Sequence, residues 1–134
     1  MKRKVLFLCS GNSCRSQMAE AIVNDRLGES WEAFSAGTKP AGSVHPKTLA
    51  ALAEIGIQHA GRSKPVSEFE GVEFDLVVTV CDSAAEECPL WLGQGKRLHH
   101  SFRDPAKSDD MNDFRSVRDE MLRVIPTILE EYAN

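Results

Sequence analysis

The chain lacks the features that mark a membrane, secreted or nucleic-acid-binding protein. The apolar run after MKRK is broken by Cys9 and Ser10, so it is too short for a secretory signal or a bilayer span. No lysine or arginine run is interleaved with aromatic residues, and the net charge of -4 gives no sign of a nucleic-acid surface. We therefore expect a cytoplasmic protein that contacts neither a membrane nor nucleic acid.

Internal repeats and low-complexity tracts are also missing, and no stretch reads as a linker. With 134 residues, the chain is long enough to bury one hydrophobic core and too short for two. The whole span 1–134 is predicted to be a single domain.

The four cysteines include no C-x-x-C pair, and the four histidines do not complete a zinc-ligand spacing. The sequence therefore predicts no metal site. In a cytoplasmic chain, thiols are more often reactive or buried than paired in permanent disulfides. The cysteines are Cys9, Cys14, Cys81 and Cys88.

Hydrophobic patterning predicts strands that alternate with helices. The predicted strands cover 4–8, 31–37, 74–81 and 96–102. The predicted helices cover 16–28, with Ser16 as its cap, 45–56, and 113–133, where Pro126 is a point at which the helix can bend. This alternation predicts an α/β fold, a four-stranded parallel sheet flanked by helices on both faces.

Sites in open α/β sheets lie beyond the carboxyl ends of the strands. Three residues whose side chains could take part in catalysis follow predicted strands in this way: Cys9, Cys81 and Asp104. We therefore expect them to converge on one crevice.

The loop between the first strand and the first helix contains no large side chain between a cysteine and an arginine. Such a loop can curl until its N–H groups form a seat for a tetrahedral oxyanion at the helix N-terminus. The predicted oxyanion-binding residues are Ser10, Gly11, Asn12, Ser13, Cys14 and Arg15. Arg15 adds a planar fork of donors, and these positive groups favour Cys9 as a thiolate nucleophile. Ser16 is placed to donate a hydrogen bond to the Cys9 sulfur.

A simpler interpretation treats this segment as an ordinary strand-loop-helix turn with buried cysteines. The position of C-x5-R directly after a buried strand and before a capped helix favours the functional interpretation.

The motif CSGNSCRSQMAEA, together with RDPA (103–106), resembles the low-molecular-weight protein tyrosine phosphatase superfamily. The segments SAGT (35–38), DLVVTVCD (75–82) and FRSVRDE (114–120) extend the similarity over essentially the whole chain, which looks most like the thioredoxin-coupled arsenate reductases. The resemblance implies a phosphatase-like fold in which Cys9 is the nucleophile, Arg15 the oxyanion clamp and Asp104 the general acid.

Two further cysteines separate the reductase from the phosphatase interpretation. Arsenate reduction needs thiols that supply two electrons: after Cys9 attacks arsenate, a second thiol attacks Cys9 and a third resolves the disulfide. Cys81 and Cys88 stand in the order expected for these two roles and match the two extra thiols that the resemblance implies. If 83–88 is helical, the Cα atoms of Cys81 and Cys88 lie on the order of 10 Å apart, whereas a disulfide needs them within about 7 Å. We therefore expect the segment to unwind as the bond forms, so that thioredoxin reaches it.

The resemblance also bears on cofactors and partners. Some arsenate reductases of this type hold potassium, and Asn12, Glu20 and Ser35 match contributing positions, but Lys64 stands where an acidic residue is usual. An ammonium group there could replace the ion, so we expect no bound metal and no other bound cofactor. The expected substrate is arsenate, with phosphate or sulfate as competing oxyanions, and the expected state is a monomer that detoxifies arsenic.

Three alternatives remain at this point. A low-molecular-weight tyrosine phosphatase would use Cys9, Arg15 and Asp104 and keep its activity without the other two thiols. The single tyrosine, Tyr132, lies near the far end, so the aromatic wall expected for a phosphotyrosine pocket is not evident. A reductase that uses an external low-molecular-weight thiol would not need both Cys81 and Cys88. A non-catalytic thiol switch would turn over at most once.

Overall fold

The computed structural model describes residues 2–82 and 96–133, and the predictions for Cys88 and for a helix at 83–88 lie outside these residues. Four parallel strands form one sheet in the order β2-β1-β3-β4. Their bounds are β1 Arg3–Cys9, β2 Trp31–Gly37, β3 Leu76–Thr79 and β4 Lys96–His99. The predicted α/β fold with a four-stranded parallel sheet is confirmed.

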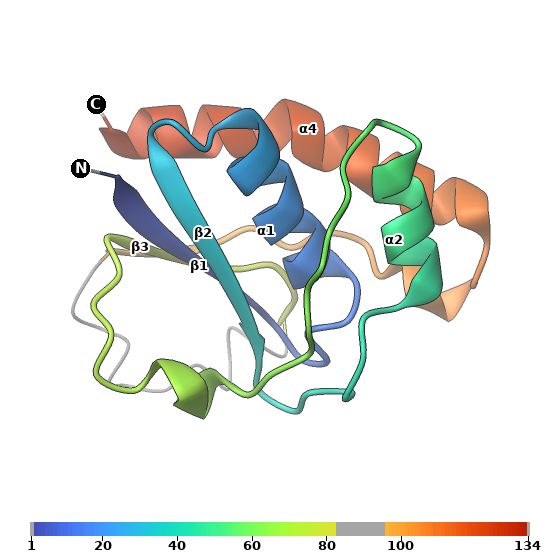
Figure 1. Cartoon of the computed structure of the whole chain (residues 1–134), viewed down its shortest axis with the longest axis horizontal. Coiled ribbons are helices and arrows are strands. Elements are labelled where there is room, and N and C mark those ends of the chain that lie inside the picture. Colours follow the sequence, from blue (N-terminus) through green and yellow to red (C-terminus); the bar gives the residue numbers. More distant parts are fainter. Residues whose placement is uncertain (1, 83–95, 134) are drawn as a thin grey trace.

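Three α-helices lie together on one side of the sheet (Figure 1). They are α1 Arg15–Arg26, α2 Pro46–Ala53 and α4 Met111–Ala133. Two 3-10 turns, η1 Val66–Phe69 and η3 Pro105–Lys107, complete the described elements. Among the described residues, no α-helix covers the opposite face of the sheet. Part of that face is covered by η1, whose Phe69 packs edge-on against Phe34 of β2. In the described part of the chain, no helix is long and apolar enough to cross a membrane.

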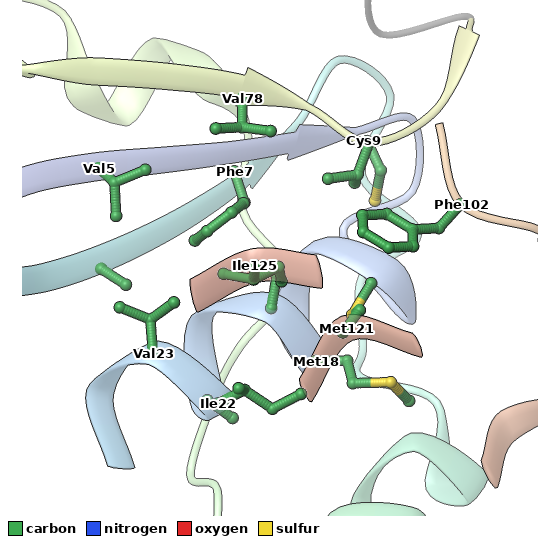
Figure 2. Packing of buried hydrophobic residues seen from close by; sticks show 14 of the residues in the cluster. Val5, Phe7, Cys9, Met18, Ile22, Val23, Val78, Phe102, Met121 and Ile125 are labelled. Carbon is green, nitrogen blue, oxygen red and sulfur yellow. The ribbon is translucent and has the colours of Figure 1, made fainter. Parts of the chain in front are cut away.

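The central strand β1 is buried because both of its neighbours are strands and both faces are covered. Val5 and Phe7 point to the helix side, where Figure 2 shows them with Ile22, Met121 and other side chains of α1 and α4. This explains the continuous apolar run of the β1 sequence, since a strand that is buried on both faces has no polar side.

The elements differ from the sequence predictions mainly at their ends. The regular pairing of β4 stops at His99, although backbone hydrogen bonds from His100 to Thr79 and from Phe102 to Val80 continue alongside the sheet. The helix α4 begins two residues earlier than predicted and continues through Pro126.

The prediction that Ser16 caps α1 is wrong. The helix begins at Arg15, its N-cap residue is Cys14, and no side chain caps it. Ser16 is instead buried, with its hydroxyl oxygen 2.9 Å from the sulfur of Cys9 and 2.7 Å from the side-chain nitrogen of Asn12. The Ser16 hydroxyl does not cap the backbone N–H groups of α1, because it interacts with Cys9 and Asn12 instead.

The helix α2 begins and ends with recognisable signals. Pro46 occupies its first turn, and Gly56, at φ +80°, follows its last turn. The N–H of Gly56 donates to the carbonyl of Ala53, and the N–H of Ile57 donates to the carbonyl of Leu52, both at 3.0 Å. This pair of bonds closes the helix end and needs the left-handed conformation that glycine adopts without a steric cost.

Candidate active site

Two of the three residues predicted to converge, Cys81 and Asp104, line one cavity at the carboxyl edge of the sheet, and Cys9 immediately precedes a third lining residue, Ser10. The cavity has a volume of about 570 Å³, and its lining includes Ser10, Arg15, Cys81 and Asp104. Cys9 ends β1 and is 3% exposed; Figure 2 shows it beside Phe102. The structure thus brings together side chains that the sequence separates by more than 90 positions.

The anion loop, residues 9–15, is shaped by hydrogen bonds to the segment that follows β2. Its carbonyl oxygens accept from backbone N–H groups in residues 38–45. The pairs are Thr38 to Cys9 at 3.2 Å, Lys39 to Ser10 at 2.9 Å, Ala41 to Gly11 at 2.8 Å, and His45 to Ser13 at 3.1 Å. A peptide C=O and the following N–H point in opposite directions, so carbonyls held outward turn the next amides inward. The loop therefore has the form of an anion-binding nest.

Gly37 sets how closely the loop approaches β2. A Cβ atom at this position would lie 2.5 Å from the carbonyl oxygen of Ser10 and 3.0 Å from the Cβ of Asn12. Asn12 itself has φ +48°, a left-handed conformation that asparagine tolerates better than most residues. The close approach explains why this strand ends in glycine.

The sulfur of Cys9 receives hydrogen bonds from the anion loop and from the first turn of α1. The N–H of Asn12 donates to it at 3.2 Å, and the Ser16 hydroxyl lies 2.9 Å away. The direction of the second bond follows from Asn12, whose side-chain oxygen accepts from the N–H of Lys64 at 3.0 Å and whose side-chain nitrogen donates to Ser16. The Ser16 hydrogen is thereby left to point at the sulfur. Donors of this kind stabilise a thiolate over a thiol.

Arg15 and Asp104 form an ion pair in the lining of the cavity. Arg15 donates to the carbonyl of Phe102 at 3.1 Å, and its other terminal nitrogen lies 3.7 Å from a carboxylate oxygen of Asp104. The second carboxylate oxygen of Asp104 accepts from the N–H of Ala106 at 3.0 Å, which caps η3. The guanidinium is therefore anchored on one side and keeps donors available on the other.

The remaining thiols have different surroundings. The sulfur of Cys81 lies 3.7 Å from the hydroxyl of Ser10, so this thiol borders the anion loop. Cys14 is 7% exposed, and burial raises the pKa of its thiol, with a smaller opposing effect from Thr48. Cys14 is therefore held as a neutral thiol.

A buried polar cluster braces the loop from behind and includes two residues that the sequence analysis missed. Gln17 donates to the side-chain oxygen of Asn12 at 2.9 Å and to the carbonyl of Arg62 at 2.8 Å. Its own side-chain oxygen therefore accepts from His59, at 2.7 Å. Burial lowers the pKa of His59, and the nearby Glu20 opposes this shift. Gln17 is fully buried in the structure, but Glu20 and Asn24 share its face of α1, so the sequence alone did not single it out.

Glu20, Ser35 and Lys64, which the family resemblance singled out, meet in the same cluster. The Ser35 hydroxyl donates to Glu20 at 2.8 Å, and the Lys64 ammonium lies 3.7 Å from the same carboxylate oxygen and 3.4 Å from Ser35. Burial lowers the pKa of Lys64, while Glu20 acts in the opposite direction. Among the described residues, no group of three or more His, Cys, Asp or Glu side chains is arranged to hold a metal ion.

Comparison with known proteins agrees with this geometry. Residues 4–133 match the family described as low molecular weight phosphotyrosine protein phosphatase. An arsenate reductase of Halalkalibacterium halodurans is 41% identical over 135 residues, which cover 96% of each chain.

Two solved structures show the same fold. A structure of an arsenate reductase in the phosphate-binding state has a TM-score of 0.85 and 28% identity, covering 97% of this chain and 98% of the other. A low molecular weight protein tyrosine phosphatase from T. tengcongensis has a TM-score of 0.80 and 26% identity, covering 97% and 99%. The resemblance noted in the sequence is confirmed, and the chain belongs to the low molecular weight phosphotyrosine protein phosphatase family.

Proposed function

We propose that the protein reduces arsenate to arsenite with its own thiols and is regenerated by thioredoxin. The observation that carries this proposal is a thiol from outside the anion loop that borders it, because Cys81 lies 3.7 Å from Ser10 in the cavity that Arg15 and Asp104 also line. A phosphatase has no use for a thiol at this position. The name of the relative from Halalkalibacterium halodurans supports the same conclusion.

In the first step, the thiolate of Cys9 attacks arsenic(V), and one arsenate oxygen leaves. The loop amides and Arg15 hold the remaining oxygens, and Asp104 supplies the proton with which the departing oxygen becomes water. The product is a covalent adduct with a bond between the Cys9 sulfur and arsenic.

In the second step, the thiolate of Cys81 attacks the sulfur of Cys9. The sulfur–arsenic bond breaks, its electron pair stays on arsenic, and arsenite leaves as a disulfide forms between the two cysteines. Cys88 then attacks Cys81, which frees Cys9 as a thiolate and leaves a Cys81–Cys88 disulfide. A thioredoxin dithiol reduces that bond, so each arsenite formed consumes two electrons from one thioredoxin.

The proposal has consequences for ligands and cellular context. Phosphate and sulfate are tetrahedral oxyanions and are expected to compete with arsenate for the anion loop. No bound cofactor is required, since all electrons pass through thiols. We propose that the enzyme acts as a single-domain monomer in the cytoplasm, where thioredoxin is available.

We also propose that Lys64 takes the place of a bound potassium ion. Its ammonium group lies 3.7 Å from Glu20 and 3.4 Å from the Ser35 hydroxyl, and its side chain is nearly buried. Two cations in so small a space would repel each other strongly. Arsenate reduction should therefore proceed equally well in potassium and sodium buffers.

The rival function is hydrolysis of phosphate esters by Cys9, Arg15 and Asp104 alone. The likeness to a tyrosine phosphatase structure favours this rival. Among the described residues, the cavity lining is against a phosphotyrosine ligand, because it is mainly polar and includes one aromatic residue, Phe102, which is only 2% exposed. These residues provide no aromatic wall for a phosphotyrosine ring.

Arsenate-dependent NADPH oxidation, measured with excess thioredoxin and thioredoxin reductase, tests the proposal. The intact protein should turn over continuously, whereas Cys88→Ser should release one arsenite per protein and Cys81→Ser should release none. Hydrolysis of an aryl phosphate by Cys81→Ser serves as the control that the anion loop is intact. If the reduced, intact protein shows no arsenate-dependent NADPH oxidation, the reductase proposal is wrong and the phosphatase function is favoured.

A further inference from the structure

The segment that carries Asp104 is fastened to the rest of the site at both of its ends. We call residues 103–109 the acid turn. At its start, Arg103 pairs with Asp113 of α4 at 2.7 Å. At its end, the N–H of Asp109 donates to the carbonyl of Pro105 at 3.2 Å and closes the turn on itself.

The side chain of Asp109 joins this turn to α2. Its carboxylate lies 3.0 Å from the ammonium of Lys47 and 3.4 Å from the ring of His45. Lys47 also donates to the backbone carbonyl of Asp109. The hydrogen bond from Lys47 holds the pKa of Asp109 below its ordinary value, so the carboxylate is charged near neutrality.

The proton position on His45 follows from its neighbours. Its Nδ1 accepts from the N–H of Lys47 at 3.1 Å and caps α2, so in the neutral ring the proton sits on Nε2. That nitrogen is the one that faces Asp109. The ring also packs against Phe114 with centroids 4.8 Å apart, which fixes its orientation.

The same histidine holds the anion loop. Its backbone N–H donates to the carbonyl of Ser13 at 3.1 Å. One residue therefore contacts both the loop that would bind the oxyanion and the turn that would deliver the proton. This contact adds to those that Arg15 makes with Phe102 and Asp104 in holding the two parts of the site together.

Asp109 adopts a conformation that needs outside support. Its φ is +55°, which is unfavourable for most side chains and is tolerated by aspartate and asparagine. Such conformations persist where the surroundings determine them. Here the surroundings are the turn bond to Pro105 and the contacts with His45 and Lys47.

We propose that His45, Lys47 and Asp109 form a clamp that positions Asp104 for proton donation to the departing arsenate oxygen. This inference rests on the proposed function, in which Asp104 is the general acid. The clamp residues are positioning residues: they act through the acid turn and do not touch the reacting atoms.

The test is a double-mutant cycle with Asp109→Asn and Asp104→Asn in the complete thioredoxin-coupled assay. Asparagine tolerates the same φ but removes the charge that Lys47 holds. Loss of the acid should lower kcat by about 100-fold or more, the usual contribution of general acid catalysis. We expect Asp109→Asn to lower kcat about tenfold, with KM changed less than twofold, because a small misplacement of the acid costs rate and leaves oxyanion binding intact.

A clamp that acts only through Asp104 makes a sharper prediction. The double variant should be no slower than Asp104→Asn, because the turn no longer carries an acid to position. Alkylation of Cys9 by iodoacetamide, and its protection by inorganic phosphate, should be unchanged in Asp109→Asn. Lys47→Met should give the same pattern. Asp119→Asn, which removes an exposed carboxylate that pairs with the buried Arg118 on α4, is the matched control and should keep the wild-type kcat.

Three results would overturn the clamp: a kcat for Asp109→Asn within twofold of wild type, an additional tenfold loss in the double variant, or a loss of phosphate protection in Asp109→Asn. The last result would mean that the residue supports the anion loop and not the acid. Failure of the proposed function would look different. The wild-type protein would then fail to reduce arsenate, or Asp104→Asn would retain the wild-type kcat.

Discussion

Replacing Lys64 with methionine should destabilise the protein strongly, because it leaves a carboxylate without its cation in a buried cluster. The ammonium lies 3.7 Å from Glu20, and the side chains of Lys64 and Glu20 are 9% and 14% exposed. With an effective dielectric constant of about 20, Coulomb's law gives an attraction of about 4 kcal/mol at this distance. Methionine preserves most of the side-chain volume, so the change is mainly electrostatic.

The net loss is smaller than the gross attraction, since burying the ammonium itself costs free energy. Removal of one partner from a buried pair typically costs about 3–5 kcal/mol. Glu20 keeps its hydrogen bond from Ser35 and some exposure, which favours a loss of about 2–3 kcal/mol. Urea unfolding, followed by tryptophan fluorescence and extrapolated linearly to water, measures this difference.

A double-mutant cycle separates the pair from its surroundings. Glu20→Gln alone should also destabilise the protein, because it leaves the Lys64 ammonium without its anion. The double variant Glu20→Gln/Lys64→Met should recover a large part of the lost free energy of unfolding. A second readout is the pKa of His59, which Lys64 lowers and which should therefore rise in Lys64→Met. The reasoning fails if Lys64→Met unfolds within about 0.5 kcal/mol of wild type or if the two single losses simply add.

Three further changes test other parts of the structure. Ser16→Ala removes the hydroxyl 2.9 Å from the Cys9 sulfur and should slow iodoacetamide alkylation of Cys9 at neutral pH about tenfold, the effect of one hydrogen bond to a charged group. Gly37→Ala should weaken phosphate protection of Cys9, since the new Cβ would lie 2.5 Å from the Ser10 carbonyl oxygen. Hydrogen bonds from two arginines lower the pKa of Glu54 from 4.5 to about 2. The stabilisation it gives is fully present above pH 4.5 and lost as pH falls toward 2, so the Tm advantage over Glu54→Gln should disappear across that range.

The order and type of the elements could be predicted from the sequence because each signal was local. Continuous apolar runs marked β1 and β3, which are buried on both faces, and Gly56 marked the end of α2. The ends of β4 and the cap of α1 were not predictable in the same way. The first depends on where pairing with β3 stops, and the second depends on a hydroxyl that the loop uses for itself.

In the site too, the features that could be predicted were those formed by residues close together in the sequence. The anion loop consists of seven consecutive residues, so its members and their chemistry could be predicted from the sequence. The buried cluster behind it joins Gln17 to His59 across 42 positions, and the clamp joins Lys47 to Asp109 across 62. Single sequences carry no direct signal for such pairs, because each residue taken alone looks like an ordinary surface or helix residue.

The register of the sheet explains how a second thiol reaches the anion loop. β1 and β3 are neighbours, and Leu8 pairs with Thr79, so two residues beyond this pair Ser10 and Cys81 stand at the same level. Their side chains accordingly meet at 3.7 Å. The proposed relay therefore requires no change in the anion loop relative to a phosphatase. It requires Cys88 and a cysteine two positions past β3, where the parallel pairing of β1 and β3 places the backbone of Cys81 level with Ser10.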